Sequence, residues 1–306
     1  MAFLINIPNR PIDKLVKRLA QMIPIDEIQV WPEVEDPSKI EFALVWNHQS
    51  GSLCDYVNLK GISSFGAGVD AILADNKLPQ VPIARIVDPS LARNMAEYVL
   101  TQIQSHRLRL WQFETQQQAS LWKPKSPRKA KTVGILGLGQ LGQASAKLLN
   151  YFGYRVLGWS RSPKRLAGVE SYDGRLGLKS MLPECDYLVC LLPLTSDTRG
   201  ILNRSLLGSL PPHAMLINVA RGEHLVEKDL LWALDHHKLD SACLDVFQHE
   251  PLEADHPFWQ HDKIRITPHV SAVTDVETAT KQIVENYQRI RRGELMLNTI
   301  DLDKGY

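Results

Sequence analysis

Cysteine is scarce in this chain. There are 4 cysteines in 306 residues, and no two of them have the Cys-x-x-Cys spacing of a zinc site or a redox motif. Scattered cysteines also cannot form the disulfide framework of a small secreted protein. We therefore expect free thiols, no metal site and a reducing, cytoplasmic location.

Long apolar runs and an excess of one charge are also absent. The longest apolar run, 187–194, has eight residues and contains a proline, whereas a membrane span needs roughly 18. The apolar N-terminus, 1–7, lacks the charged lead and the cleavage site of a signal peptide. Because 35 Lys+Arg balance 34 Asp+Glu, for a net charge of +1, we expect neither a membrane nor a nucleic acid as a partner.

Alternating structural patterns fill most of the sequence. Hydrophobic residues make up 44% and charged residues 23%, as in ordinary globular proteins. Strands are expected at 3–7, 42–46, 62–65, 81–87, 132–136, 154–159, 187–192, 214–219, 241–246 and 264–267, and helices at 11–22, 89–118, 140–152, 226–237 and 275–292. Apolar strands alternating with helices indicate parallel sheets covered on both faces, so we predict an α/β fold.

The length indicates two domains, since one domain usually has roughly 100–200 residues. A basic connector with two prolines, Lys123–Lys131, precedes the half in which the alternation is sharpest. We expect two Rossmann-like domains with parallel sheets. A dinucleotide-binding domain at 103–273 is inserted into a substrate-binding domain made of 1–102 and 274–306.

A glycine-rich turn links a predicted strand to a predicted helix in the second half. Its sequence is Gly137-Leu-Gly139-Gln140-Leu141-Gly142. Gly137 permits a tight turn, Gly139 lets the backbone approach a pyrophosphate, and Gly142 lets the helix pack closely on the strand. The helix N-terminus offers unpaired N–H groups to phosphates. We expect this turn, with Gln140 and Leu141, to bind a dinucleotide; a purely structural turn is the alternative.

The end of the next predicted strand lacks the carboxylate that usually binds the ribose hydroxyls of NAD. It carries hydroxyls and cations instead: Ser160, Arg161, Ser162, Lys164 and Arg165. Arg161 can bind a 2′-phosphate through two charge-assisted hydrogen bonds, whereas a carboxylate would repel it. We therefore predict NADP as cofactor, with NADPH preferred over NADH. Solvated surface charge is the alternative for Lys164 and Arg165.

Three charged or titratable residues follow successive strands of the same half: Arg221, Glu250 and His269. The carboxyl ends of parallel strands share one edge of the sheet, so these residues should converge near the glycine turn. Their combination indicates hydride transfer to a carbonyl, with His269 donating the proton to the developing alkoxide. Glu250 would favour the imidazolium form and Arg221 would hold a carboxylate. Taken singly, each residue has an ordinary structural explanation.

These residues stand in motifs that resemble the D-2-hydroxyacid dehydrogenase family over the whole chain. The motifs are Gly137-x-Gly139-x-x-Gly142, Asn218-x-Ala220-Arg221-Gly222, Asp245-Val-Phe-x-x-Glu250-Pro251-Leu252 and Thr267-Pro268-His269. The resemblance implies Arg221 as substrate ligand, His269 as acid/base and Glu250 as its partner. It also implies that Asp245 lies near the nicotinamide carboxamide. Further candidates along the cofactor are Leu192, Pro193, Thr198, Val219 and Ala220.

Within the family, the chain is similar to glyoxylate/hydroxypyruvate reductases of the A type. The similar segments are Ala43–Trp46, Phe65–Asp70, Trp159–Arg161 and Gly305–Tyr306. This similarity implies NADPH, small 2-oxo acid substrates (glyoxylate and hydroxypyruvate) and a homodimer whose arm includes 89–118. It implies that the N–H groups of Ala67 and Gly68 bind the substrate carboxylate while Trp46 and Arg85 close the pocket. Core packing is the alternative for Trp46, and an ion pair for Arg85. Ser271 departs from the small apolar residues usual in the family.

Other functions stay open at this point. A bulkier 2-oxo acid or a 3-phosphoglycerate-like compound would use the same mechanism, although Trp46 argues against bulk. A formate dehydrogenase is disfavoured, because Glu250 stands where that branch has an amide. The same fold also serves as a dinucleotide-sensing, protein-binding module in corepressors that resemble the family. Such a module would bind NADPH tightly and turn over poorly.

Overall fold

The computed structural model describes residues 1–8, 10–302 and 304–305. The chain forms two compact units, one of Met1–Pro89 with Thr274–Tyr306 (unit 1) and one of Ser90–Val273 (unit 2). Unit 2 is thus an insertion in unit 1. The first division falls at the first residue of a long helix, Pro89–Arg107, whereas the boundary expected from the sequence lies inside that helix, after residue 102. Tyr306, which supported part of the family resemblance, lies outside the described residues.

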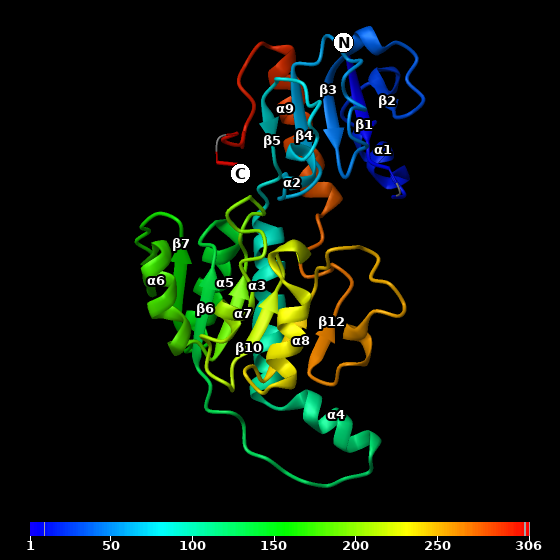
Figure 1. Ribbon diagram of the computed structural model, residues 1–306. Coiled ribbons are helices and arrows are strands. Elements are labelled where there is room, and N and C mark those ends of the chain that lie inside the picture. The colour runs from blue at the N-terminus through cyan, green and yellow to red at the C-terminus, as the bar shows by residue number, and fades with distance from the viewer. Residues whose placement is uncertain (9, 303, 306) are drawn as a thin grey trace. The chain divides into compact units, whose positions relative to one another are not determined.

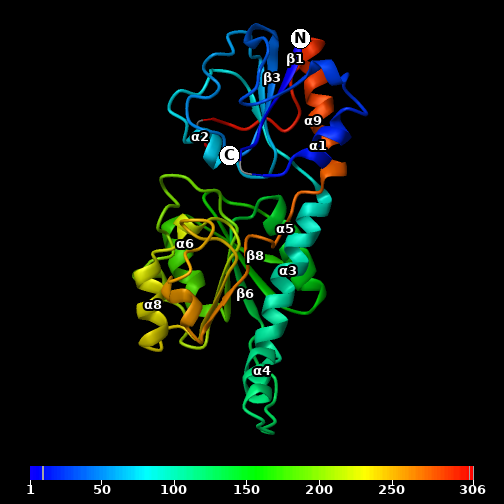
Figure 2. The ribbon, with the colours of Figure 1, turned by 90° about the vertical axis from the view of Figure 1, so that its right-hand side faces the viewer.

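Unit 1 is built on a five-stranded parallel sheet in the order β2-β1-β3-β4-β5. Its elements are β1 (Ala2–Asn6), α1 (Asp13–Leu19), β2 (Ile28–Val30), β3 (Ile40–Val45), β4 (Gly61–Ser64), α2 (Asp70–Leu73), β5 (Ile83–Ala84) and α9 (Val276–Arg291). Side chains alternate across the sheet: Phe3 and Ile5 pack in the core with α1 and α9, while Leu4 joins the opposite core with Ile72 of α2. Figure 2 shows these helices on the two sides of the sheet.

Unit 2 is built on a seven-stranded parallel sheet in the order β12-β11-β10-β9-β6-β7-β8. Its strands are β6 (Thr132–Leu136), β7 (Arg155–Ser160), β8 (Val169–Asp173), β9 (Tyr187–Cys190), β10 (Met215–Asn218), β11 (Ser241–Leu244) and β12 (Ile264–Ile266). Its helices are α3 (Pro89–Arg107), α4 (Leu110–Gln118), α5 (Gln140–Tyr151), α6 (Gly174–Met181), α7 (Arg204–Leu207) and α8 (Glu227–Asp235). One face packs on α3 and α5, and the other on α6, α7 and α8. The predicted α/β fold with parallel sheets is confirmed.

The order of the strands in each sheet indicates where a ligand can bind. In unit 2 the order reverses between β6 and β9, and in unit 1 between β1 and β3. Ligands of open parallel sheets bind outside the carboxyl ends of the strands at such a reversal. The glycine turn that follows β6 therefore lies where a dinucleotide is expected.

The segment 89–118 differs from its prediction as one continuous helix. It forms α3 and α4, separated at Arg109, whose φ of +63° is left-handed. No glycine or proline marks this break in the sequence. Helix α4 buries none of its residues and extends with the following connector away from the sheet of unit 2 (Figure 1). No described helix is long and apolar enough to cross a membrane.

Candidate active site

The glycine turn of unit 2 has the shape that a dinucleotide needs. Gly137 has a φ of +101°, and a Cβ on it would lie 2.6 Å from the carbonyl oxygen of Leu191. A Cβ on Gly142 would lie 2.0 Å from the carbonyl oxygen of Gly137, so the helix α5 packs directly on the turn. Around Gly139 nothing lies within 4 Å of the Cβ position. The turn thus leaves open space beside backbone N–H groups at the start of a 12-residue helix, which fits a pyrophosphate.

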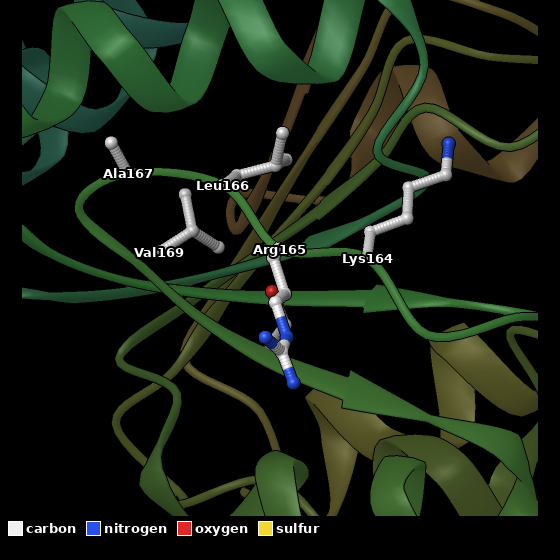
Figure 3. A pocket seen from close by; sticks show the side chains of 6 residues that line it. Lys164, Arg165, Leu166, Ala167 and Val169 are labelled. Atoms are coloured by element: carbon white, nitrogen blue, oxygen red, sulfur yellow. The ribbon is translucent and has the colours of Figure 1, made fainter.

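The end of β7 brings a cation to this turn. The Lys164 Nζ donates a hydrogen bond to the carbonyl oxygen of Leu138, between the first two glycines, over 2.9 Å. The Ser160 hydroxyl is buried and donates to the carbonyl oxygen of Ser162 over 2.8 Å. Arg161 and Arg165 are exposed. Figure 3 shows the Lys164 and Arg165 side chains pointing in different directions at an open hollow of about 500 Å³.

His269 and Glu250 form a pair at the same edge of the sheet. The His269 Nδ1 lies 2.8 Å from the Glu250 Oε2, and both side chains are about one-third exposed, at 37% and 36%. The other Glu250 oxygen accepts the N–H of Phe247 over 3.0 Å. Burial would raise the pKa of Glu250, but the His269 contact, this N–H and the charge of Arg221 together hold that pKa below its usual range. The carboxylate is therefore ionised at neutral pH and favours a proton on His269 Nδ1, so that Nε2 is the ring nitrogen not engaged by Glu250.

The loop that carries His269 is held in a left-handed conformation. His269 has a φ of +53°, which is uncommon for a residue with a Cβ. The fully buried Asp245 carboxylate accepts hydrogen bonds from the Thr267 hydroxyl and from the N–H groups of Val270 and Ser271, and the His269 N–H donates to the Asp245 carbonyl over 2.8 Å. These bonds offset the backbone strain. The approach of Asp245 to a nicotinamide stays a prediction.

Arg221 follows β10 and is positioned by a buried amide. The Asn218 Nδ2 donates to the Arg221 carbonyl over 2.9 Å, and its Oδ1 accepts the Ala220 N–H over 3.3 Å. Val219 and Ala220, both expected at the cofactor, are buried in this turn. The charge of Arg221 is one of the causes that lower the pKa of Glu250, and both residues follow neighbouring strands at the carboxyl edge of the sheet. The structure thus brings Arg221, Glu250 and His269 to one edge of unit 2.

The loop after β9 carries the remaining cofactor candidates. The Thr198 hydroxyl donates to the Pro193 carbonyl over 2.7 Å and accepts the Thr195 N–H over 2.9 Å. Leu192 and Thr198 are 8% and 9% exposed, so their side chains are buried beneath the loop and stabilise its conformation. Pro193 is half-buried.

Unit 1 carries the predicted substrate-binding residues at the carboxyl ends of its own strands. The Trp46 ring packs on Gly66, where a Cβ would lie 2.2 Å from the ring. Trp46 therefore contributes to packing and also lies beside the turn that follows β4 and carries Ala67 and Gly68. Within the described chain, the N–H groups of Ala67 and Gly68 donate no hydrogen bond. The Arg85 guanidinium likewise has no ion pair or hydrogen bond to a described residue, and burial lowers its pKa. Two free N–H donors in a half-buried turn are suited to an anion.

Sequence reasoning missed several residues that support the site. The Tyr98 hydroxyl lies 2.6 Å from the Thr267 hydroxyl, which in turn donates to Asp245, and the buried His224 contacts the backbone of Arg221. Only His224 had a signal, since it lies three residues after Arg221, directly beyond the motif that ends at Gly222. Tyr98 is separated by 169 positions from its partner, and nothing local indicates that pairing.

Comparison with known proteins identifies the family of the chain. The sequence profile of the family "D-isomer specific 2-hydroxyacid dehydrogenase, NAD binding domain" matches residues 100–271. A protein of Yersinia enterocolitica named glyoxylate/hydroxypyruvate reductase A is 40% identical over 296 residues, covering 94% of each chain.

Two solved structures cover the entire chain. A D-isomer specific 2-hydroxyacid dehydrogenase of Xanthobacter autotrophicus, in complex with NADPH and MES, has a TM-score of 0.94 and 38% identity, over 100% of this chain and 99% of its own. An NADPH-dependent glyoxylate/hydroxypyruvate reductase of Sinorhizobium meliloti, in complex with NADP and sulfate, has a TM-score of 0.93 and 36% identity, over 100% and 99%. The family predicted from the motifs is thereby confirmed.

Proposed function

Since the chain belongs to the D-isomer specific 2-hydroxyacid dehydrogenase family, we propose that it reduces small 2-oxo acids, glyoxylate and hydroxypyruvate, with NADPH. The observation that carries this proposal is the 2.8 Å contact between His269 and Glu250, with Arg221 near it, on the sheet edge that holds the open glycine turn. An acid, a carboxylate partner and a cation in this arrangement suit carbonyl reduction beside a carboxylate.

The chain's own residues supply the proton and the orientation. When bound, NADPH supplies the hydride that the carbonyl carbon of the substrate accepts. His269 donates its Nε2 proton to the oxygen as negative charge develops there. Glu250 keeps the opposite ring nitrogen protonated and stabilises the charged imidazole. Arg221 holds the substrate carboxylate and polarises the neighbouring carbonyl.

The preference for NADPH rests on the cations after β7. Arg161 and Ser162 are exposed, and the segment 155–169 contains no Asp or Glu that would repel a 2′-phosphate. Lys164 is fixed at the glycine turn by its bond to Leu138, so its charge lies along the cofactor's phosphates. Arg161 is the main ligand of the 2′-phosphate, with Ser160, Ser162 and Lys164 in support. The relatives solved with NADPH and NADP support this assignment.

Unit 1 supplies the second half of substrate recognition. The free N–H groups of Ala67 and Gly68 bind the substrate carboxylate, and the Trp46 ring limits the size of the substrate. Arg85 adds a desolvated positive charge, and its lowered pKa reflects the burial of a guanidinium without a described partner. A partly buried cation without a partner is costly unless a ligand anion compensates it.

The exposed arm supports a homodimer. Helix α4 buries no residue, and apolar side chains on and beside it are exposed: Leu110 at 45%, Leu121 at 47% and Trp122 at 95%. Large exposed apolar groups mark interfaces, and a second copy of the chain is the partner. Light scattering should give twice the monomer mass for the native protein, and Trp122→Ser with Leu121→Ser should weaken the dimer. A monomer at all concentrations would overturn this assignment.

The four free cysteines support a location in the reducing cytoplasm, where thiols are not joined in disulfides.

The decisive experiment is an assay of reduced-nicotinamide oxidation with NADPH or NADH, each against glyoxylate, hydroxypyruvate and pyruvate. We expect NADPH with the two small substrates to react fastest. The variant His269→Ala should lose about 10³-fold in kcat/KM, because general acid catalysis contributes roughly 10² to 10⁴-fold, and it should still bind NADPH. Tight NADPH binding without turnover of any 2-oxo acid would contradict the proposal and favour a sensing module.

A further inference from the structure

His224 is a fully buried histidine outside the predicted catalytic set. It is the last residue of the short 3-10 helix Gly222–His224 (η4), which follows Arg221. The exposed fraction of His224 is 0%. A buried imidazole needs partners for both ring nitrogens, because an unpaired polar group in the interior is costly. The partners of His224 are backbone groups of two different loops.

One ring nitrogen faces Arg221 and the other faces Pro193. The Arg221 N–H donates to the His224 Nδ1 over 3.2 Å, and the His224 Nε2 lies 3.3 Å from the Pro193 carbonyl oxygen. The Nδ1 also lies 3.2 Å from the Arg221 carbonyl oxygen, so both backbone groups of Arg221 contact this nitrogen. In the neutral ring with its proton on Nε2, the ring donates to the Pro193 carbonyl and Nδ1 accepts the Arg221 N–H. Burial lowers the pKa of His224, in keeping with a neutral ring.

The surrounding backbone joins the same two loops. The Gly200 N–H donates to the Glu223 carbonyl and the Leu202 N–H to the His224 carbonyl, each over 2.8 Å. Gly222 packs on the next loop so tightly that a Cβ would lie 1.9 Å from the Phe247 carbonyl carbon. The turn of Arg221 is therefore fixed on both sides, and His224 is the side chain that crosses from it to Pro193.

We propose that His224 is a positioning residue that sets the substrate ligand Arg221 relative to the cofactor loop at Pro193. The inference rests on the proposed function of Arg221 and Pro193. One hydrogen bond of His224 fixes the backbone from which the guanidinium extends. The other fixes the loop beside the nicotinamide. Small errors in such placement lower the rate strongly, since a shift of about 1 Å can cost about 100-fold.

Three substitutions separate the two hydrogen bonds. His224→Asn places an oxygen near the Nδ1 position and retains the bond to Arg221. His224→Gln places an N–H near the Nε2 position and retains the bond to Pro193. His224→Leu retains neither. The matched control is His106→Leu, because His106 is also buried, with Nε2 2.8 Å from Asp240 and Nδ1 3.3 Å from the Tyr187 hydroxyl. Tyr187 and Asp240 stand at the amino ends of β9 and β11, the edge opposite to Arg221.

The readouts are the KM for the 2-oxo acid, kcat, the Kd of NADPH and the thermal midpoint of each variant. For His224→Leu we expect kcat/KM for the 2-oxo acid to fall about 30-fold, since a buried group left unpaired costs about 5- to 150-fold. His224→Gln should mainly raise the KM of the 2-oxo acid, and His224→Asn should mainly raise the Kd of NADPH. His106→Leu should lower the thermal midpoint and leave kcat/KM within about twofold. The polar variants keep the test valid if His224→Leu does not fold.

A double-substitution cycle tests the route through Arg221. In an Arg221→Ala background, His224→Leu should change kcat/KM for the 2-oxo acid less than about threefold, because residues that act as one unit are not additive. The inference would be overturned if the losses of kcat/KM for Arg221→Ala and His224→Leu multiplied in the double variant. It would also be overturned if His224→Asn and His224→Gln changed the KM of the 2-oxo acid and the Kd of NADPH equally. If the native protein turned over no 2-oxo acid, the proposed function would fail instead. The NADPH affinities of the Asn and Gln variants would then still decide the Pro193 contact.

Discussion

Two glycine-containing turns, one in each unit, follow parallel strands and differ in what they leave open. The turn after β6 leads into the 12-residue helix α5, and Gly139 has open space beside it. The turn after β4 leads into the four-residue helix α2, and its Gly66 is covered by the Trp46 ring. In unit 2 the glycine leaves open space, whereas in unit 1 a side chain fills the space beside the glycine.

This difference fits two kinds of anion. An extended diphosphate needs a long open turn with several N–H groups and a helix dipole. A small carboxylate needs few donors and a wall that limits its size. The N–H groups of Ala67 and Gly68 beside the Trp46 ring provide the second arrangement. Four substitutions test the comparison, in order of decreasing effect.

The largest effect is expected for Gly142→Ala. The added Cβ would lie 2.0 Å from the Gly137 carbonyl oxygen, and backbone on both sides cannot move away cheaply. Overpacking of this kind costs about 1–3 kcal/mol, so we expect NADPH to bind up to about 100-fold more weakly. Titration of NADPH fluorescence measures this. Gly177→Ala is the control, because its Cβ would meet nothing closer than 3.4 Å; unchanged affinity in Gly142→Ala would contradict the role of the turn.

Arg161→Gln should change the choice between cofactors. Losing a charged hydrogen-bond donor to the 2′-phosphate costs about 1.5–3 kcal/mol, so the ratio of kcat/KM for NADPH to that for NADH should fall about 10- to 100-fold. Arg165→Gln removes an equal charge from an exposed neighbour and should lower the ratio less than threefold by screening alone. Equal effects of the two substitutions would show that net charge, and not a specific contact, selects NADPH.

Gly66→Ala should act on the substrate alone. The Cβ would lie 2.2 Å from the Trp46 ring and would displace a side chain, which yields more easily than backbone. We expect the KM of the 2-oxo acid to rise about tenfold while the Kd of NADPH stays within twofold. Steady-state kinetics at saturating NADPH measure the first quantity and fluorescence titration the second. A parallel loss of NADPH affinity would break the distinction between the two turns.

The smallest effect on activity is expected in the loop that follows Trp46, where a buried carboxylate contributes to stability instead. The buried Asp75 carboxylate accepts hydrogen bonds from the Ser50 hydroxyl, the N–H groups of Gly51 and Lys77, and the His48 ring. Burial would raise the pKa of Asp75, but these bonds together lower it to about 2. A depressed pKa stabilises the fold above the unfolded value of 3.8, and this stabilisation is lost as the pH falls towards 2.

Asp75→Asn should therefore lower the free energy of unfolding by about 2 kcal/mol at pH 7. The difference from the native protein should shrink as the pH falls from about 4 to 2, because the unfolded carboxyl takes up its proton first and the native carboxyl does so only near pH 2. Urea unfolding at pH 7 and pH 3 measures both values. Asp36→Asn, at an exposed carboxylate, is the control. A difference that did not depend on pH would contradict the assignment.

Local patterns predicted much of this molecule. Glycine spacing located the turn at Gly137, and near-continuous apolar strands located the buried sheet of unit 2. Elements with weaker patterns were not predicted: the short edge strand β2 and the polar edge strand β8 bury few side chains. The break at Arg109 was also missed, because a left-handed arginine leaves no mark in the sequence.

The sequence by itself determined the chemistry of this protein: which acids, cations and glycines are present, and that each follows a strand. Those features are local, since periodicity and spacing depend on neighbours along the chain. Only the tertiary structure decided how the reacting groups are held. The bond between Tyr98 and Thr267, the cover of Trp46 on Gly66 and the bridge of His224 from Arg221 to Pro193 join residues from different strands and loops. Such contacts exist only after the sheets have packed, because packing, and not sequence proximity, brings those side chains together.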